Sequence, residues 1–336
     1  MTIKDLAAIT GYAVGTVSRA LNDHPNVSDK ARKAILQAAK EYGFQLNVNA
    51  KQLKQIHSNN ILVMVKGTGN ELFGEMLEYI QNLIAKTHYQ LVVNYMDEDS
   101  NEVIHAIQLC REKKPLGILF LGGNTKNFAA DFDKIDVPCV EVTNDASLLP
   151  FPNLSSVTTD DREAARCAIN TLVAYGHRKI AVIGGDRDTS DISRLRYEGC
   201  LISFGEHGIA FDPDRDYQGV RFSWDDGYKA TKKLLINGSA FTAIFAVSDV
   251  MAIGAIRALW EAGLRVPEDV SIIGLDGLAL GKYLIPQLST VRQNFQAIAL
   301  RSVEILLDAI EDGAPARHET VPFEVERRES IRRIGK

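Results

Sequence analysis

The side chains best suited to chemistry lie on one face of a short segment near the N-terminus. Helical spacing over Val14–Leu21 predicts an inward stripe formed by Ala13, Val17, Ala20 and Leu21. The opposite face then carries Val14, Gly15, Ser18, Arg19 and Asn22. An arginine can donate two parallel hydrogen bonds to guanine in the DNA major groove, which discriminates against a wrong base by about 1–3 kcal/mol. The alternative interpretation is an ordinary solvated helix face.

Patterns typical of enzymes and metal proteins are missing from the rest of the sequence. The four cysteines (110, 139, 167 and 200) are too far apart for a CxxC motif, and the seven histidines form no HxxxH or HExxH pattern. No GxSxG, SxxK or GxxxxGK[ST] motif occurs. The acidic pairs Asp160–Asp161 and Asp225–Asp226 fall at expected helix starts, where the helix dipole favours them. We therefore expect no enzyme activity, no metal and no cofactor.

Charge is divided unevenly along the 336 residues. Residues 1–57 contain eight basic and four acidic side chains, whereas the remainder contains 30 basic and 39 acidic ones. A basic head on an acidic body predicts that the head meets a polyanion. The sequence contains neither an apolar run of about 18 residues nor a secretion signal at its start, which predicts a cytoplasmic protein that does not contact membranes.

Three short helices are expected to position the N-terminal face. The first covers Ile3–Thr10 and stops at Gly11, and the third starts after the N-cap Ser28 and ends at Gly43. The third helix is expected to bury Ala31, Ile35, Ala38 and Tyr42. This is the helix-turn-helix plan, in which the second helix enters the major groove. Polar side chains suited to phosphate or groove contacts are Thr2, Thr16, Ser18 and Asn22.

From residue 60 onward, short apolar runs alternate with amphipathic helical stretches. The predicted strands are 61–65, 91–95, 116–121, 139–143, 180–183, 243–247 and 271–275. Such alternation indicates parallel sheets covered by helices on both faces, and the number of units favours two lobes. We expect the chain to recross between the lobes near Val291–Arg292 and at the turn 313–315. Ligands bind outside the carboxyl ends of such strands, so a cleft between the lobes is the expected site.

Several motifs resemble the lac/galactose repressor family. In the head these are Thr2–Ala7, Gly15–Asn22 and Val27–Arg32, and in the body they are Gly176–Ile180, Ser248–Ala255, Val266–Asp276 and Leu288–Val291. The resemblance implies an all-α helix-turn-helix head followed by a bilobed α/β body like a periplasmic binding protein, with two parallel sheets. It also implies that Val14, Gly15 and Arg19 carry most of the choice of operator. Ala13 departs from the family, which has a serine N-cap there, and losing that cap costs about 1 kcal/mol.

The resemblance also assigns the linker and the domain boundaries. Asn47, Ala50 and Leu53 match the family's hinge helix, and Leu53 would be the side chain that wedges into the minor groove. Leu46 replaces the family's proline, and the basic residues that normally follow the hinge are absent. We expect a head at 1–45, a hinge at 46–58 and a body at 59–336. The first lobe is expected to comprise residues 59–160 and 293–320, and the second lobe residues 161–292 and 321–336.

By the same resemblance, eight residues are candidates for binding a small effector. They are Phe73, Thr143, Asp160, Arg196, Phe222, Trp224, Ser248 and Asp276. An arginine and an aspartate that frame a cleft suit a polyol, because one donates hydrogen bonds and the other accepts them. A structural salt bridge between Arg196 and Asp276 is the alternative, and Phe73 and Phe222 could instead belong to the core.

Together these features predict a transcriptional regulator, expected to act as a repressor. Two heads of a homodimer would bind a pseudo-palindromic operator in double-stranded DNA, and a small effector, expected to be a sugar or sugar derivative, would control binding. Two other functions stay open at this point. One is a cytoplasmic sugar-binding protein with a non-functional head, and the other is a sugar-modifying enzyme with such a head.

Overall fold

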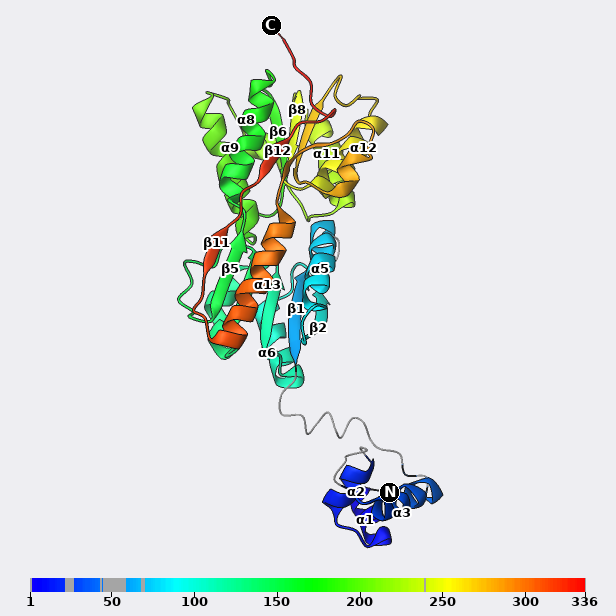
Figure 1. Ribbon diagram of the computed structural model, residues 1–336. Coiled ribbons are helices and arrows are strands. Elements are labelled where there is room, and N and C mark those ends of the chain that lie inside the picture. The colour runs from blue at the N-terminus through cyan, green and yellow to red at the C-terminus, as the bar shows by residue number, and fades with distance from the viewer. Residues whose placement is uncertain are drawn as a thin grey trace. The chain divides into compact units, whose positions relative to one another are not determined.

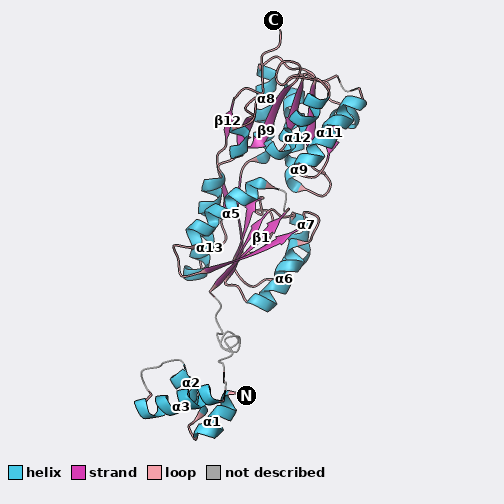
Figure 2. Ribbon diagram, turned by 90° about the vertical axis from the view of Figure 1, so that its right-hand side faces the viewer, coloured by secondary structure: helices cyan, strands magenta, loops and turns pink. Residues whose placement is uncertain are grey.

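The computed structural model describes residues 2–21, 27–42, 44, 59–67, 70–238 and 240–335. By its contacts the chain forms two compact units, Met1–His57 and Ser58–Lys336, and each is described by itself (Figures 1 and 2). Four of the residues predicted to contact DNA, Asn22, Asn47, Ala50 and Leu53, lie outside the described residues.

The N-terminal unit contains the helices α1 (Ile3–Thr10), α2 (Val14–Leu21) and α3 (Asp29–Glu41). They pack around a small core that includes Leu6, Val17 and Ile35, each with no exposed surface. Thr2 caps α1: its hydroxyl accepts from the Asp5 amide, and the Asp5 carboxylate accepts from the Thr2 amide. Ser28 caps α3 as predicted, by accepting from the Ala31 amide.

Two predicted core positions of the head are wrong. Ala13 is exposed because it precedes α2, where its carbonyl accepts the first hydrogen bonds of the helix from Thr16 and Val17. Tyr42 is 51% exposed because it follows the last residue of α3 and has left the helical stripe. Ala39 is buried instead.

The body begins with a six-stranded sheet in the order β11-β5-β4-β3-β1-β2, all parallel. Its strands are β1 (Asn60–Lys66), β2 (Gln90–Met96), β3 (Gly117–Leu121), β4 (Cys139–Thr143), β5 (Leu154–Thr158) and β11 (His318–Thr320). Its helices are α5 (Glu71–Ile84), α6 (Glu102–Lys113), α7 (Thr125–Asp131), the short η1 (Phe132–Lys134) and α13 (Phe295–Asp312). α5 and α13 pack together over one face, and α6 and α7 cover the other.

A second six-stranded sheet has the order β12-β10-β9-β8-β6-β7. Its strands are β6 (Ile180–Gly184), β7 (Tyr217–Gly219), β8 (Ala243–Ala246), β9 (Ser271–Asp276), β10 (Ser289–Arg292) and β12 (Glu324–Glu326). Its helices are α8 (Asp161–Ala174), α9 (Asp191–Glu206), α10 (Pro213–Asp216), α11 (Trp224–Ile236), α12 (Asp249–Glu261) and η2 (Ala279–Lys282). α8 packs with α9, and α11 packs with α12. Only β12, among the described strands, departs from the predicted parallel arrangement, because it pairs antiparallel with β10.

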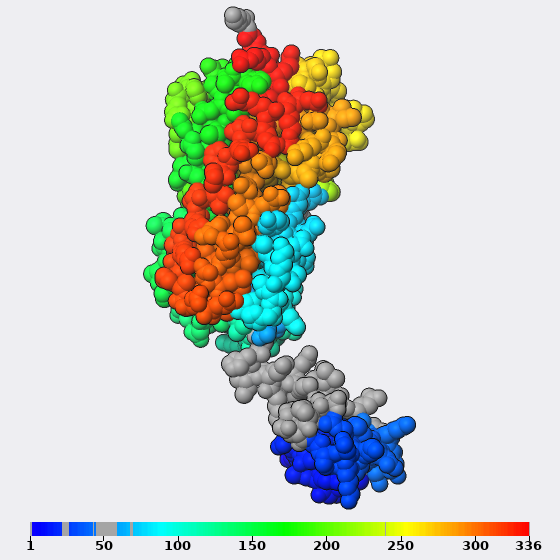
Figure 3. All heavy atoms as spheres, viewed as in Figure 1, coloured from blue at the N-terminus to red at the C-terminus, as the bar shows by residue number. Residues whose placement is uncertain are grey.

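The chain crosses between the two lobes three times, between β5 and α8, between β10 and α13, and between β11 and β12. The predicted crossing at 313–315 is wrong. Gly313, with φ +66°, ends α13, and the chain then adds β11 to the first sheet before it leaves. The C-terminal segment therefore runs along the surface of both lobes, beside α13 (Figure 3). These three connecting segments hold the lobes together. They leave the carboxyl ends of the β-strands available to line a cleft.

Candidate functional site

The exposed face of α2 is the candidate contact surface of the head. Val17 and Ala20 turn inward, which leaves Val14 (42% exposed), Gly15 and Arg19 on the outer face, with Thr16 and Ser18 half-buried beside them. The structure therefore brings five of the predicted residues together on one helix. A Cβ atom at Gly15 would lie 3.8 Å from an Arg19 guanidinium nitrogen, so a small residue here leaves that side chain unobstructed. Thr2 lies at the start of α1, where its hydroxyl takes part in the cap.

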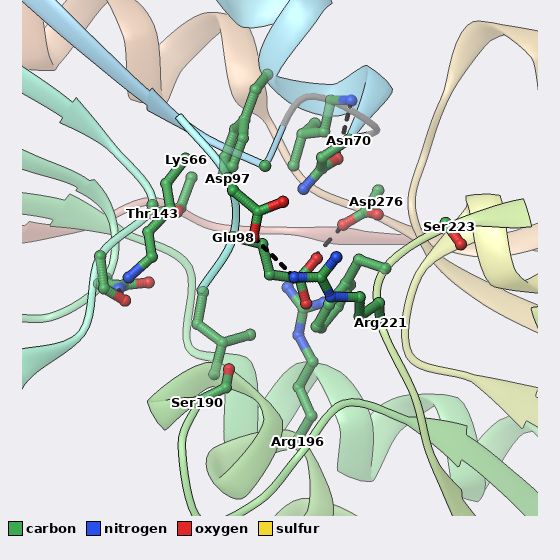
Figure 4. Close-up of a pocket in the computed structure, with 18 of the residues that line it drawn as sticks. Lys66, Asn70, Asp97, Glu98, Thr143, Ser190, Arg196, Arg221, Ser223 and Asp276 are labelled. Atoms are coloured by element: carbon green, nitrogen blue, oxygen red, sulfur yellow. Dashed lines mark hydrogen bonds and ion pairs between the residues drawn. The ribbon is translucent and has the colours of Figure 1, made fainter. Parts of the chain in front are cut away.

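In the body, a cavity of about 360 Å³ lies between the lobes at the carboxyl ends of both sheets. Five of the predicted effector residues line it, namely Phe73, Thr143, Arg196, Phe222 and Asp276. Figure 4 shows side chains from both lobes around this cavity, with Lys66 and Thr143 from the first lobe and Arg196 and Asp276 from the second. Parallel strands with loops at their carboxyl ends create such a crevice, which explains why the site could be placed from the strand pattern.

Arg196 stands at the centre of the second-lobe wall and is only 4% exposed. Its Nε donates to Asp161 Oδ1 at 2.7 Å, its Nη1 donates to the Val247 carbonyl at 2.5 Å, and its Nη2 lies 3.9 Å from Asp276 Oδ1. Burial raises the pKa of both Asp161 and Asp276, and the Arg196 charge opposes that shift. The guanidinium is thus both a structural ion-pair partner and a wall of the cavity.

Asp276 is held in an unusual backbone conformation, with φ +127°. Its carboxylate accepts from the Ser248 hydroxyl at 2.7 Å and from the Gln293 side-chain amide at 2.8 Å. Ser248 is therefore a support for Asp276 and does not line the cavity. Strained conformations of this kind persist only where surrounding contacts fix them, and they concentrate at ligand sites.

Asp249, at the start of α12, supplies the contacts that fix this turn. Its carboxylate accepts from the amides of Gly277 at 2.9 Å and Leu278 at 2.8 Å, and from the Thr290 hydroxyl at 2.7 Å. Complete burial raises its pKa to about 8, against the effect of these donors. A Cβ at Gly274 would lie 2.1 Å from Asp249 Oδ1, so glycine makes room for this carboxylate.

The first-lobe wall contains buried polar atoms without partners in the described structure. Thr143, a β-branched residue at φ +82°, has an unpaired hydroxyl, and the side-chain carbonyl of Asn144 is also unpaired. Both residues line the cavity and are only 4% exposed. Since buried polar atoms are nearly always hydrogen-bonded, these two are the groups that a polar ligand would satisfy. Behind them Glu141 is buried, and burial beside Glu102 holds its pKa well above the usual range.

The aromatic candidates have different environments. Phe73 is buried and its ring fits closely against Gly122, where a Cβ would come within 3.0 Å of the ring, so it combines a core role with a place in the wall. Phe222 is half-buried and faces the cavity from the second lobe. Trp224 is 48% exposed and lines a neighbouring groove with Tyr95.

Asp160 does not reach the cavity. It is exposed and caps α8 by accepting from the Glu163 amide at 3.0 Å, in agreement with the alternative that acids at helix starts are caps. Asp160, Trp224 and Ser248 thus do not line this cavity: the first caps α8, the second lines a neighbouring groove and the third supports Asp276.

Several lining residues were missed from the sequence. They lie at or just after the ends of strands, or at the starts of helices: Lys66, Asn70, Asp97, Glu98, Asn144, Ser190, Arg221, Ser223, Asp226 and Gln293. The available signal was position for Lys66, Asp97, Glu98 and Asn144, which follow a predicted strand within a few residues, whereas Arg221 and Gln293 follow strands that were not predicted. Arg221 of the second lobe joins the first lobe through Asp97, at 2.7 Å, and through Asp99. Asp191 adds a second link by accepting from the Thr125 amide and hydroxyl.

The described residues were also compared with the patterns of metal sites and membrane spans. Among the described residues, no cluster of three or more His, Cys, Asp or Glu side chains is arranged to hold a metal ion. Within the same part of the chain, no helix is long and apolar enough to cross a bilayer. The four cysteines are free thiols, and burial raises the pKa of Cys139 and Cys200.

Comparison with known proteins assigns both units. A family model for bacterial regulatory proteins of the lacI family matches residues 2–47, and a model for a periplasmic binding protein-like domain matches residues 169–331. The HTH-type transcriptional regulator MalR of Clostridium butyricum is 34% identical over 98% of this chain and 99% of its own. Catabolite control protein A of Priestia megaterium is 30% identical over 90% of this chain and 91% of its own.

Among solved structures, the lac repressor dimer bound to operator and the anti-inducer ONPF is 25% identical, with a TM-score of 0.74 over 99% of both chains. A LacI family transcriptional regulator from Enterococcus faecium with bound ribose is also 25% identical. Its TM-score is 0.71, and the match covers 82% of this chain and all of that one. The relatives are regulators and not enzymes. The chain belongs to the lacI family of bacterial regulatory proteins, and it is a DNA-binding transcriptional repressor.

Proposed function

We propose that this repressor recognises its operator through α2, and that a sugar bound in the cleft between the lobes changes its affinity for the operator. The observation that carries the proposal is the cleft itself. Buried Arg196 and Asp276 supply hydrogen-bond donors and acceptors from one lobe, and Thr143 and Asn144 offer unpaired oxygens from the other. A polyol, whose hydroxyls both donate and accept, fits such a wall. The relative with bound ribose supports a sugar ligand.

In the head, Arg19 would form the base-specific contact, Val14 would make an apolar contact, and Gly15 would let the helix approach the groove closely. Thr16, Ser18 and Thr2 would position the helix on the backbone. Asn22 and the hinge residues Asn47, Ala50 and Leu53 keep the roles that the family resemblance implies. We infer that two copies act together as a homodimer in the cytoplasm on a pseudo-palindromic site, as the operator-bound dimer of the lac repressor suggests.

The sugar would control operator binding through the arrangement of the two lobes. The links from Arg221 to Asp97 and from Asp191 to Thr125 join the lobes across the cavity. A ligand that binds one arrangement of the lobes better than another shifts the balance by its differential affinity and by no more than that. We expect the arrangement favoured by the sugar to differ from the one that favours operator binding.

Replacing Arg19 with Ala is expected to weaken specific operator binding by about 1–3 kcal/mol, or roughly five- to 150-fold, because a bidentate contact to guanine is lost. The operator is first selected from a random-sequence DNA pool with the wild-type protein, and binding is then measured by fluorescence anisotropy. Lys33→Ala is the matched control, since it removes the same charge from an exposed position on α3. Equal weakening in both variants would mean that Arg19 contributes only charge.

The sugar response is tested with the same operator. A panel of monosaccharides and disaccharides is added to the complex, and at least one sugar is expected to change operator affinity tenfold or more, which corresponds to about 1.4 kcal/mol of coupling. Isothermal titration without DNA then gives the affinity of that sugar for the body. If the selected operator is bound but no sugar on the panel binds, the sugar assignment fails while the DNA-binding assignment stands.

A further inference from the structure

The lining of the cleft contains four acidic side chains, Asp97, Glu98, Asp226 and Asp276, against three basic ones. Three basic side chains line it, and each is already paired with acids. Lys66 pairs with buried Glu102 at 2.6 Å. Arg196 has two carboxylate neighbours, Asp161 and Asp276, and Arg221 has Asp97 and Asp99. A ligand phosphate or carboxylate entering the cleft would therefore meet basic groups whose positive charge is already offset by these acids.

Two further carboxylates in the lining have no ion-pair partner in the described part of the chain. Glu98 lies in the first lobe, in the loop after β2, and Asp226 lies in the second lobe, in the first turn of α11. Asp226 accepts only from Ser223, whose hydroxyl is 2.6 Å away. Each raises the energy of any further negative charge in the cavity.

These two carboxylates influence each other across the opening between the lobes. The pKa of Glu98 is raised chiefly by its partial burial. Arg221 opposes this shift, whereas Asp99, Asp97 and Asp226 add to it. Figure 4 shows Glu98 beside Asp97 and close to the Arg221 guanidinium. Around the Arg221 guanidinium, the four carboxylates of Asp97, Glu98, Asp99 and Asp226 outnumber this one positive charge, which disfavours a further negative charge beside them.

The remaining polar atoms suit an uncharged ligand. The unpaired hydroxyl of Thr143 and the unpaired side-chain carbonyl of Asn144 are buried and line the same cavity. An amide carbonyl can only accept hydrogen bonds, so it prefers a ligand hydroxyl or amine to a carboxylate or phosphate oxygen. The Asn144 carbonyl thus favours the same class of ligand as the charges do, whereas the Thr143 hydroxyl can donate or accept.

We propose that the cleft selects sugars that carry no acidic group, and that Glu98 and Asp226 set this selectivity. The inference rests on the proposed function, because it specifies the class of sugar that the same site accepts. Neutral sugars and amino sugars are admitted, whereas sugar phosphates and sugar acids are excluded.

The test uses sets of sugars that share one ring. Each neutral sugar that binds in titration calorimetry is compared with its amine-, carboxylate- and phosphate-bearing forms, for example glucose with glucosamine, glucuronate and glucose 6-phosphate. Full-length protein is used at low ionic strength, where electrostatic effects are largest. The acidic forms are expected to bind at least tenfold more weakly than the neutral sugar.

Charge-neutral variants then assign the effect to residues. Glu98→Gln and Asp226→Asn keep the side-chain shapes, and each is expected to raise the affinity for the acidic form about tenfold relative to the neutral form. Their combination should raise it further. Glu268→Gln, at an exposed position in the second lobe, removes the same charge far from the lining and should leave the ratio unchanged. Thermal melting confirms that each variant is folded.

The outcomes distinguish a failure of the proposed function from a failure of the charge selectivity. If no neutral or amino sugar binds, the proposed function fails and this inference fails with it. If a neutral sugar binds and its acidic form binds equally well or better, only the charge selectivity is overturned. If the selectivity is present but unchanged in the double variant, Glu98 and Asp226 are not its source and that assignment is overturned.

Discussion

Replacing Arg196 with Ala is expected to lower the free energy of unfolding of the body by about 3–5 kcal/mol, because it leaves Asp161 and Asp276 buried without their cationic partner. The Val247 carbonyl also loses its donor. In the molecules that remain folded, the response to sugar is expected to be lost, since Arg196 lines the cavity. Urea unfolding followed by circular dichroism gives the first quantity, and titration calorimetry at 10 °C gives the second.

Arg194→Ala is the matched control for this variant. Arg194 lies on the same helix and pairs with Asp191 and Glu198, but it is exposed, and such pairs contribute about 0–1 kcal/mol. Arg196→Lys keeps the charge but loses the fork geometry, so it should recover part of the stability and little of the sugar binding. An Arg196→Ala protein as stable as Arg194→Ala would show that the acids are protonated or solvated without Arg196.

The head illustrates what helical periodicity can and cannot predict. The three helices, the Ser28 cap and the outward face of α2 follow from residue spacing and from cap chemistry, which act over a few residues. Ala13 and Tyr42 were misplaced because both lie just outside a helix, where the 100° rotation per residue no longer applies. The burial of a residue at a helix boundary depends on how the chain turns there, and the hydrophobic pattern carries no information about that turn.

The body was predictable to the extent that its strands are continuous apolar runs. All seven predicted strands are present within a residue or two, whereas β5, β7, β10, β11 and β12 were missed. The missed strands are short, and several contain polar residues, such as Ser289 and Thr290 in β10, that bury their hydroxyls in specific hydrogen bonds. Their place depends on the three lobe crossings, which join segments that are distant in sequence.

The cleft was predictable by position more than by residue. Strand ends located it, and resemblance supplied Arg196 and Asp276. Glu98 and Arg221, however, enter it from loops whose course no periodicity fixes, and Asp226 enters it from the first turn of α11. Ser248 and Asp160 illustrate the converse case. Both are polar residues at helix starts near the cleft, yet one supports Asp276 and the other caps α8. Only the three-dimensional contacts distinguish a side chain that lines a cavity from one that supports it.

Replacing Asp249 with Ala is expected to cost about 3–6 kcal/mol, because it leaves two buried amides, Gly277 and Leu278, and the Thr290 hydroxyl without an acceptor. The turn that holds Asp276 at φ +127° would then relax, and Asp276 would leave the cavity wall. Sugar affinity is therefore expected to fall together with stability, although Asp249 does not line the cavity. Urea unfolding and titration calorimetry measure the two losses.

Asp249→Asn keeps the shape of the side chain and removes its negative charge, so it separates the effects of the two. Its carbonyl can accept from the two amides while its NH2 donates to the Thr290 hydroxyl. At about pH 4, where the wild-type side chain is also uncharged in the folded protein, its stability should therefore stay within about 1 kcal/mol of the wild type. Burial raises the pKa of Asp249 to about 8 in the folded protein, above the ordinary value of 3.8, so folding favours its protonated form. The wild type should then lose stability relative to Asp249→Asn as pH rises from about 4 to 8. A constant difference across that range would mean that Asp249 folds as a carboxylate and that its three donors outweigh the cost of its burial.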